Sequence, residues 1–222
     1  MDSSPRLVLF GPPGAGKGTQ AQLLKDRLGV AHISSGDLFR YHLQQETPLG
    51  QRVSHYVRQG LLVPDEVTIE IILDKVLAFS PDAGFILDGF PRTTHQAEAL
   101  EGALASRSRR LDKVVFIDVP EEELLRRLGG RYICRSCQTP HTVPGGQHPP
   151  RCGKCGGELY QREDDRPESV KRRIEVYRRD TMPVLEFYRQ RGLLADVAGV
   201  GGIECINQRV LAALGQEPAA RS

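Results

Sequence analysis

The chain has no long run of apolar residues. Nowhere in its 222 residues do apolar side chains continue for the roughly 20 positions that a membrane-spanning helix needs. The first residues, MDSSPRLVLFG, have no basic segment that precedes a long apolar stretch and a small-residue cleavage site. The sequence therefore predicts no membrane contact, and we expect a cytoplasmic location.

The chain also has little excess charge of either sign. Its 30 basic and 28 acidic residues leave a formal net charge of +2, and the basic residues are spread along the chain. Such a balance does not call for a polyanionic polymer as partner, so we expect no nucleic acid, while small phosphorylated ligands remain suitable. Arginine outnumbers lysine 24 to 6 in all regions, so composition alone singles out no individual arginine.

Cysteine is scarce, and four of the five cysteines lie in one short segment. The stretch CRSCQTPHTVPGGQHPPRCGKC, residues 134–155, holds two CxxC pairs. In a reducing compartment such pairs bind metal more often than they form disulfides. Four thiolates at this spacing suit tetrahedral Zn²⁺ with no open coordination position, which predicts a structural metal site. The expected ligands are Cys134, Cys137, Cys152 and Cys155.

Other interpretations of this segment stay open at the level of sequence. It could be a nucleic-acid-binding zinc module, a redox site, or a metal site in which His141 or His148 replaces a thiolate. A nucleic-acid module predicts a basic surface that carries aromatic residues. Apart from histidines, the basic residues of 138–160 are only Arg151 and Lys154, and Tyr160 is the single aromatic residue. The sequence therefore favours a structural role.

Short apolar segments bounded by turn residues alternate with helical patterns along most of the chain. This alternation is typical of a parallel sheet that helices cover on both faces, as in the P-loop NTPases. Cys205 falls on an apolar face of the last helical pattern, so we expect it to be buried. Strands are predicted at 6–10, 30–34, 84–88, 113–119 and 192–197, which gives an α/β fold with a five-stranded parallel sheet. Helices are predicted near 16–28, 65–79, 93–105, 121–128, 167–190 and 203–214.

Two segments interrupt the alternation. Residues 36–60 indicate two short helices separated by Pro48 and Gly50. Residues 130–165 contain few large apolar side chains, so they cannot build an ordinary core. Both segments are expected at the carboxyl ends of strands, where open α/β sheets bind their ligands.

The stretch GPPGAGKGT, Gly11 to Thr19, follows a strand pattern and opens a helical one, which is typical of a phosphate-binding loop. Its glycines let successive N–H groups point at one phosphate, and the helix N-terminus adds positive potential. We expect Lys17 to bridge the outer phosphates. Gly18 stands where this motif usually has Ser or Thr, with Thr19 one position later, so a hydroxyl directly on Mg²⁺ is less well supported.

The stretch LDGFPRT, Leu87 to Thr93, ends another predicted strand. We expect Asp88 to hold Mg²⁺ through its water shell, because hard cations prefer carboxylate and water oxygens. Arg92 follows at the same edge, and its planar guanidinium suits a phosphate held by two parallel hydrogen bonds.

The order of several motifs makes the chain resemble adenylate kinases over nearly its whole length. The motifs are GPPGAGKGTQ, ISSGDLFR, GLLVPDE, LDGFPRT with the following Gln96, RLGGR and QREDDRPESVKRRIEVY. The long 130–165 insertion and its four cysteines resemble the long-lid, zinc-bearing class. The resemblance implies a core of residues 1–35, 64–129 and 166–222, an AMP lobe at 36–63 and a lid at 130–165.

The resemblance also implies roles for individual residues. Two of them depart from the family pattern: Ser35 stands where many relatives have Thr, and Gly201 matches the family's ATP-binding stretch only approximately. ATP would be bound by Gly14, Ala15, Gly16, Lys17, Gly18, Thr19, Arg127, Arg131, Thr139, Pro140 and Gly201. AMP would be bound by Ser35, Arg40, Leu61, Leu62, Val63, Gly89, Phe90, Arg92, Gln96, Arg162 and Arg173. The catalytic set would be Lys17, Asp88, Arg92, Arg131, Arg162 and Arg173.

The chemistry agrees with these implied roles. Phosphoryl transfer between two nucleotides brings two polyanions together, so cations must surround the transition state and water must be excluded. The acceptor is an already ionised phosphate oxygen, so we expect direct in-line transfer from ATP to AMP, which gives ADP, with no phosphoenzyme. Asp164 and Asp165 would orient the arginines or carry the lid hinge, unless they form a solvated pair. We expect a monomer. The alternative is a related kinase that accepts UMP or CMP or uses GTP as donor.

Overall fold

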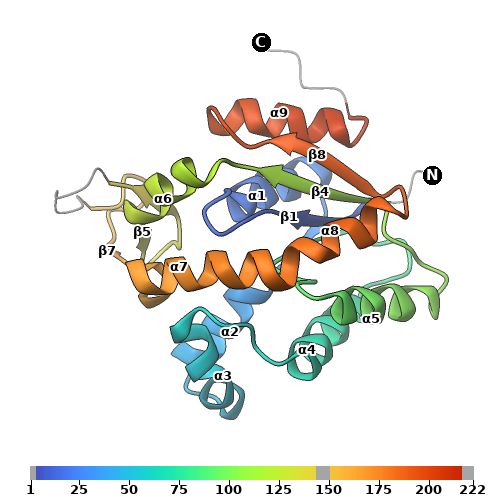
Figure 1. The fold of residues 1–222 in the computed structure, drawn as a ribbon, viewed down its shortest axis with the longest axis horizontal. Coiled ribbons are helices and arrows are strands. Elements are labelled where there is room, and N and C mark those ends of the chain that lie inside the picture. The colour runs from blue at the N-terminus through green and yellow to red at the C-terminus, as the bar shows by residue number, and fades with distance from the viewer. Residues whose placement is uncertain (1–3, 144–150, 217–222) are drawn as a thin grey trace.

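The computed structural model describes residues 4–143 and 151–216 (Figure 1). Its central sheet has five parallel strands in the order β2-β3-β1-β4-β8. The prediction of a five-stranded parallel sheet is confirmed, with strand ends within two residues of those expected. The strands are β1 Arg6–Phe10, β2 Ala31–Ser34, β3 Phe85–Asp88, β4 Lys113–Asp118 and β8 Leu194–Ala198.

Helices cover both faces of this sheet because strand side chains alternate between the faces. Val8 and Phe10 of β1 pack into one apolar cluster with α4, α5 and α8. Leu7 and Leu9 point the other way, into a second cluster with α1, α6 and α9. In Figure 1, α9 lies above the sheet, and α4 and α5 lie below it. The bounds are α1 Lys17–Leu28, α4 Asp65–Leu77, α5 Thr94–Ala105, α6 Glu121–Gly129, α8 Met182–Arg189 and α9 Ile203–Ala213.

The strand order places a ligand crevice beside β1. From β1 the chain crosses to β2 at one edge of the sheet, whereas β4 and β8 continue on the other side of β1. Loops that leave the carboxyl ends of β1 and β3 therefore diverge and leave a crevice between them. Gly11 follows β1, and Gly89 follows β3.

The helix expected at 167–190 is interrupted. α7 (Pro167–Val176) runs into a π-helical turn at Tyr177–Thr181, which leads into α8. Pro183, in the first turn of α8, has no N–H to donate and would clash with a carbonyl four residues earlier. The wider turn relieves that clash, and the Met182 N–H instead bonds to the Tyr177 carbonyl.

Residues 36–60 form two short helices as expected, α2 (Ser35–Gln44) and α3 (Pro48–Gln59). Contrary to the prediction, Pro48 and Gly50 do not separate them but lie in the first turn of α3. Side chains cap both helices: Ser34 Oγ accepts from the Asp37 N–H, and Thr47 Oγ1 accepts from the Gly50 N–H. The two helices share a small apolar cluster centred on Phe39, Val53 and Val63.

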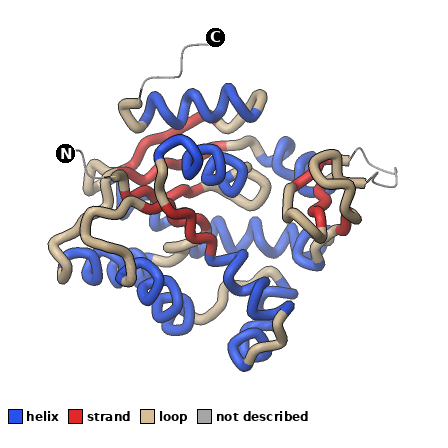
Figure 2. The backbone as a smooth tube through the Cα atoms, turned by 180° about the vertical axis from the view of Figure 1, so that it is seen from behind, coloured by secondary structure: helices blue, strands red, loops and turns tan. Residues whose placement is uncertain are grey.

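Residues 130–165, called the cysteine segment from here on, contain a small antiparallel sheet that the sequence did not predict. Its strands are β5 (Arg131–Cys134), β6 (Pro140–Thr142) and β7 (Leu159–Tyr160), with β5 in the middle. Figure 2 shows this sheet well separated from the central one. The buried apolar residues described here are few, which agrees with the expectation that this segment builds no ordinary core. His148 lies outside the described residues.

Two further expectations concern exposure. Cys205 is exposed, so its predicted burial is wrong; the buried residues of α9 begin at Ile206, and Cys205 lies just outside that stripe. Among the described residues, no helix is both long enough and apolar enough to cross a membrane.

Candidate active site

The loop from Gly11 to Thr19 joins β1 to the start of α1. Gly16 is the N-cap residue of α1 and has a φ of 90°, a left-handed conformation that favours glycine. No side chain caps this helix, and its first turn holds no acidic residue. The first N–H groups of α1 are therefore available to an anion, at the positive end of the helix. The loop residues predicted to hold ATP phosphates are Gly14, Ala15, Gly16, Lys17, Gly18 and Thr19.

Lys17 bends back over this loop. Its Nζ donates to the carbonyl oxygens of Gly11 at 2.7 Å and Pro12 at 3.1 Å. Burial lowers the pKa of Lys17 to about 8; Asp88 opposes that shift, while Arg92 and other arginines add to it. An anion with several negative charges would restore the ordinary pKa.

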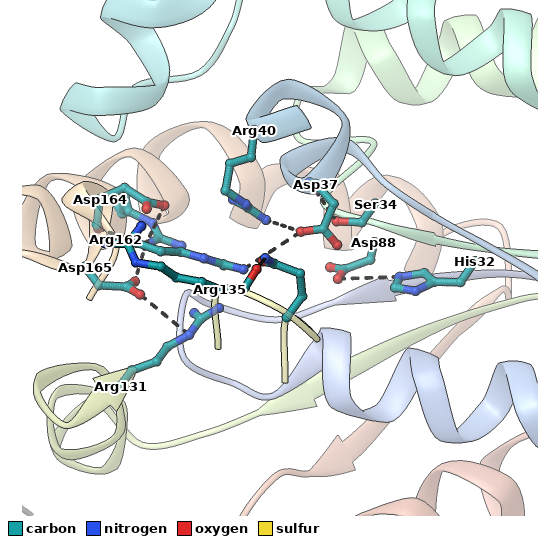
Figure 3. A network of polar contacts seen from close by, with 12 residues as sticks. His32, Ser34, Asp37, Arg40, Asp88, Arg131, Arg135, Arg162, Asp164 and Asp165 are labelled. Atoms are coloured by element: carbon teal, nitrogen blue, oxygen red, sulfur yellow. Dashed lines mark hydrogen bonds and ion pairs between the residues drawn. The ribbon is translucent and has the colours of Figure 1, made fainter. Parts of the chain in front are cut away.

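Asp88 ends β3 on the opposite side of the crevice. A Cβ atom placed on Gly18 would lie 3.5 Å from Asp88 Oδ2, so this carboxylate faces the phosphate-binding loop. His32 Nε2 lies 3.8 Å from the same oxygen (Figure 3). Burial raises the pKa of Asp88, but His32 and Lys17 outweigh burial and hold that pKa below its usual value. An ionised carboxylate and nearby water are suitable ligands for Mg²⁺.

Two adjoining pockets open between the loop, α7 and the α2–α3 hairpin, and Arg92 and Arg173 line both. The first pocket, on the side of the loop, includes Gly11, Pro13 and Lys17. The second pocket gathers nine of the residues predicted for AMP: Ser35, Arg40, Leu61, Leu62, Val63, Gly89, Arg92, Gln96 and Arg173.

Gly89 connects the parts of the second pocket. Ser35 Oγ donates to its carbonyl at 2.7 Å, and Arg92 Nε donates to the same carbonyl at 2.8 Å. Gly89 has a φ of 79°, and a Cβ there would lie 2.7 Å from Ser35 Oγ. Phe90, also predicted for AMP, instead buries its side chain in the main core, with 1% exposed.

Gln96 lines the second pocket and is buried, with 1% of its surface exposed. Its Oε1 accepts from the Arg92 N–H at 2.7 Å, and its Nε2 donates to Asp65 Oδ1 at 2.6 Å. The side-chain amide is therefore held in one orientation.

Asp164 and Asp165, at the end of the cysteine segment, form ion pairs with arginines. Asp165 is 2% exposed, and its carboxylate lies 2.9 Å from Arg173 Nη1 and 3.6 Å from Arg131 Nε. Asp164 Oδ2 lies 3.2 Å from Arg173 Nη1. The interpretation that these carboxylates orient arginines is confirmed, and that of a solvated pair is wrong.

Asp37 links two further arginines across the site, as Figure 3 shows. Its Oδ1 accepts from Arg40 Nη2 and lies 4.0 Å from Arg162 Nη2. Burial and the nearby Arg40 lower the pKa of Arg162 to about 10. Burial and the charge of Arg173 lower that of Arg92 to about 10. Arg131 Nε and Arg162 Nε are buried without a hydrogen bond, so this cluster of like charges has donors available for anions.

The remaining residues predicted to bind ATP lie in two places. Arg127 Nη2 donates to the Gly199 carbonyl at 2.9 Å, which brings it to the exposed loop that contains Gly201. Thr139 Oγ1 lies 3.2 Å from Cys137 Sγ, so it contacts the cysteines. Pro140 begins β6 and is exposed. Their contacts with ATP stay a prediction.

The four predicted cysteine ligands converge. Their sulfur atoms all lie within 4.8 Å of one another, with Cys134 and Cys155 3.5 Å apart and Cys137 and Cys152 3.6 Å apart. Four sulfurs at the usual Zn–S distance of about 2.3 Å form a tetrahedron with edges of about 3.8 Å, so the geometry fits. Hydrogen bonding with Thr139 lowers the pKa of Cys137 to about 6. A backbone hydrogen bond with Gly157 lowers the pKa of Cys155, but contacts with Cys137 and Cys134 outweigh it and raise that pKa. His141 Nε2 lies 3.2 Å from Cys152 Sγ.

Sequence reasoning missed Asp37, Asp65 and Thr68. Asp37 and Asp65 contact predicted site residues, and Thr68 lines the second pocket. An Asp in the first turn of a helix is ordinarily a favourable partner of the helix dipole, so neither Asp gave a distinct signal. Only their contacts with distant residues reveal a further role.

Comparison with known proteins identifies the family. The model of the family described as adenylate kinase matches residues 9–193. The chain belongs to the adenylate kinase family. It is 48% identical over 216 residues to an adenylate kinase of Caldicellulosiruptor saccharolyticus, with 96% of this chain and all of the relative covered. It is also 48% identical over 222 residues to one of Streptomyces avermitilis, with 97% of this chain and all of the relative covered.

These matches confirm the predicted family and enzyme class. The enzyme is a nucleoside monophosphate kinase, and the alternative of a different base preference is not favoured. The family implies ATP, AMP and ADP as substrates. The P-loop fold and the cysteine cluster agree with the long-lid class expected from the sequence.

Proposed function

We propose that the enzyme transfers the terminal phosphoryl group of ATP directly to AMP at the boundary of the two pockets. The observation that carries this proposal is that Arg92 and Arg173 line both pockets. ATP phosphates bind to the loop and Lys17, and AMP binds in the second pocket with its phosphate at Arg40, Arg92 and Arg173. The two phosphate chains then meet between the shared arginines.

The arginines stabilise the charge of the transition state. Arg131 and Arg162 approach from the cysteine segment with Nε groups that make no hydrogen bond, and their guanidinium groups add to those of Arg92 and Arg173. Because an AMP phosphate oxygen is already ionised, the reaction needs no general base and no covalent intermediate. Mg²⁺ bound with ATP would supply further charge neutralisation, and the Asp88 carboxylate would hold it through its water molecules.

Closure of the two inserted segments completes the site. Residues 36–63 are proposed as the AMP lobe and 130–165 as the lid, with the rest of the chain as the core. Cys134, Cys137, Cys152 and Cys155 would hold a structural Zn²⁺. The bound metal would stiffen the lid, so that the lid could close as one body and exclude water. We further propose a cytoplasmic monomer that binds no nucleic acid or membrane.

A coupled assay that crosses ATP and GTP with AMP, CMP, UMP and GMP tests the reaction. We expect the rate of ADP formation from ATP and AMP to exceed the rate of phosphoryl transfer to any other acceptor. A faster reaction with another acceptor contradicts the substrate assignment. Acid quench of a reaction with radiolabelled ATP is expected to leave no label on protein, and acid-stable label on protein contradicts direct transfer.

A further inference from the structure

We propose that Asp65 is a positioning residue that sets the purine specificity of the second pocket, because it fixes the polarity of the Gln96 amide. This inference rests on the proposed function, in which AMP binds in the second pocket; Gln96 lines that pocket and is taken to contact the acceptor base. Asp65 begins α4, and Gln96 lies 31 positions later in the first turn of α5. Their contact therefore joins two helix starts beside the pocket.

Two contacts leave the Gln96 amide one permitted orientation. Asp65 Oδ1 lies 2.6 Å from one end of the amide, and the Arg92 N–H lies 2.7 Å from the other. An ionised carboxylate only accepts hydrogen bonds, and a backbone N–H only donates. The NH₂ group must therefore face Asp65, and the oxygen must face Arg92. A rotated amide would place two acceptors together at Asp65 and two donors together at Arg92.

Asp65 is itself held in place. Its second oxygen, Oδ2, accepts from Thr93 Oγ1 at 2.6 Å, and Thr93 caps α5 by accepting from the Gln96 N–H at 3.2 Å. His95 Nδ1 lies 3.3 Å from the same Asp65 oxygen. Because both carboxylate oxygens are engaged, the side chain cannot turn away without breaking a contact on the other side.

The fixed amide has one N–H and one oxygen lone pair left for a ligand. Adenine presents an acceptor, N1, beside a donor, the 6-amino group, which complement that N–H and lone pair. Hypoxanthine and guanine present the opposite pair, an N1–H donor beside an O6 acceptor. These two bases need the rotated amide, which Asp65 and the Arg92 N–H oppose. Because buried hydrogen-bonding groups would be left unpaired, the pocket should discriminate strongly against these two bases in favour of adenine.

The test compares AMP with inosine monophosphate (IMP), whose base differs from adenine only at N1 and position 6. The wild-type enzyme is expected to prefer AMP. In Asp65→Ala the amide is held only by Arg92, so we expect the ratio of kcat/KM for AMP to that for IMP to fall about tenfold, the effect of losing one hydrogen bond to a charged group. In Asp65→Asn the new amide can offer either a donor or an acceptor to Gln96, so it also permits the rotated amide, and we expect the ratio to fall by a similar factor.

Glu66→Gln is the matched control. Glu66 is exposed, and its substitution removes the same charge from the same helix turn as Asp65→Ala does. We expect the ratio of kcat/KM for AMP to that for IMP to stay at its wild-type value in this variant. A purely structural role for Asp65 would lower both kcat/KM values equally. The proposal is overturned if folded Asp65→Ala and Asp65→Asn, checked by thermal melting, keep the wild-type ratio. Failure of the wild-type enzyme to phosphorylate AMP would instead overturn the proposed function.

Discussion

Asp165 Oδ1 lies 2.9 Å from Arg173 Nη1, and the Asp165 side chain is fully buried. Arg131 Nε lies 3.6 Å from the other oxygen of that carboxylate. One buried carboxylate therefore positions two arginines that are proposed to bind phosphate, one from α7 and one from the cysteine segment. Asp165, the last residue of the proposed lid, thereby links that segment to α7 of the proposed core.

We expect Asp165→Asn to reduce both stability and activity. Loss of a charged hydrogen-bond partner should lower the free energy of unfolding by about 1–3 kcal/mol, and kcat should fall because both arginines lose their orientation. Urea denaturation and steady-state rates measure the two effects. The control is Glu163→Gln, since Glu163 is exposed and pairs with exposed Arg58; an exposed pair contributes about 0–1 kcal/mol. Equal effects of the two substitutions would contradict this role of Asp165.

The lowered pKa of Lys17 makes ATP binding depend on pH. Because that pKa is about 8 in the free protein, much of Lys17 is neutral above pH 8. Bound phosphates favour the charged form, so ATP binding at about pH 8.5 should take up a proton, whereas near pH 7 Lys17 already carries it. Calorimetry in buffers of different ionisation enthalpy measures this uptake. No uptake at the higher pH would contradict the placement of Lys17 against phosphate.

The same pKa predicts an effect on stability. The folded pKa lies below the unfolded value of 10.5, so between about pH 8 and 10.5 the unfolded chain binds more protons at Lys17 than the folded chain does. The Lys17 contribution to the free energy of unfolding should therefore rise with pH across this window. Lys17→Met should remove that rise, which urea denaturation at several pH values can measure.

If the four clustered cysteines bind metal, the number of thiols that react with a thiol reagent should depend on whether the metal is present. With Zn²⁺ bound, only exposed Cys205 should react with a thiol reagent in the folded protein. After chelation all five cysteines should react, and the melting temperature should fall because the metal contributes to folding of this segment. Cys205→Ser is the control and should remove the single fast-reacting thiol. An unchanged melting temperature after verified metal loss would contradict the structural role.

Gly89 should tolerate no side chain. In Gly89→Ala the added Cβ would lie 2.7 Å from Ser35 Oγ and 3.0 Å from Arg92 Nη2, at a φ of 79°. We expect KM for AMP to rise at least about tenfold, since a displacement of about 1 Å in a site can cost a hundredfold. Gly102→Ala is the control, because a Cβ there meets nothing within 4 Å and alanine favours the helix. An unchanged KM for AMP in Gly89→Ala would contradict the placement of the AMP phosphate.

The sequence predicts the central fold well because its signals are local. Each of the five parallel strands is a short apolar run bounded by turn residues, and each expected helix has a corresponding segment. The π-helical turn at Tyr177–Thr181 depends on how Pro183 is accommodated, which the helical pattern does not reveal. The strands of the small sheet escaped prediction because β6 and β7 have three and two residues and little apolar content.

The candidate site was predictable where backbone motifs define it and not where distant side chains meet. The loop at Gly11–Thr19 and the cysteine pairs are recognisable from spacing alone. The contacts of Asp37 with Arg162 and of Asp65 with Gln96 join residues that are far apart in the sequence. Cys205 was misplaced because an apolar helix face is defined only to within a residue or two by the pattern.

The central claim is that the phosphate chain of ATP and the phosphate of AMP meet between Arg92 and Arg173. The most direct measurement is calorimetric binding of a bisubstrate compound in which five phosphates join two adenosines. We expect one molecule to bind per chain and to exclude both ATP and AMP, with affinity reduced in Arg173→Lys. Binding of two molecules per chain, or competition with only one of the two nucleotides, would contradict the claim.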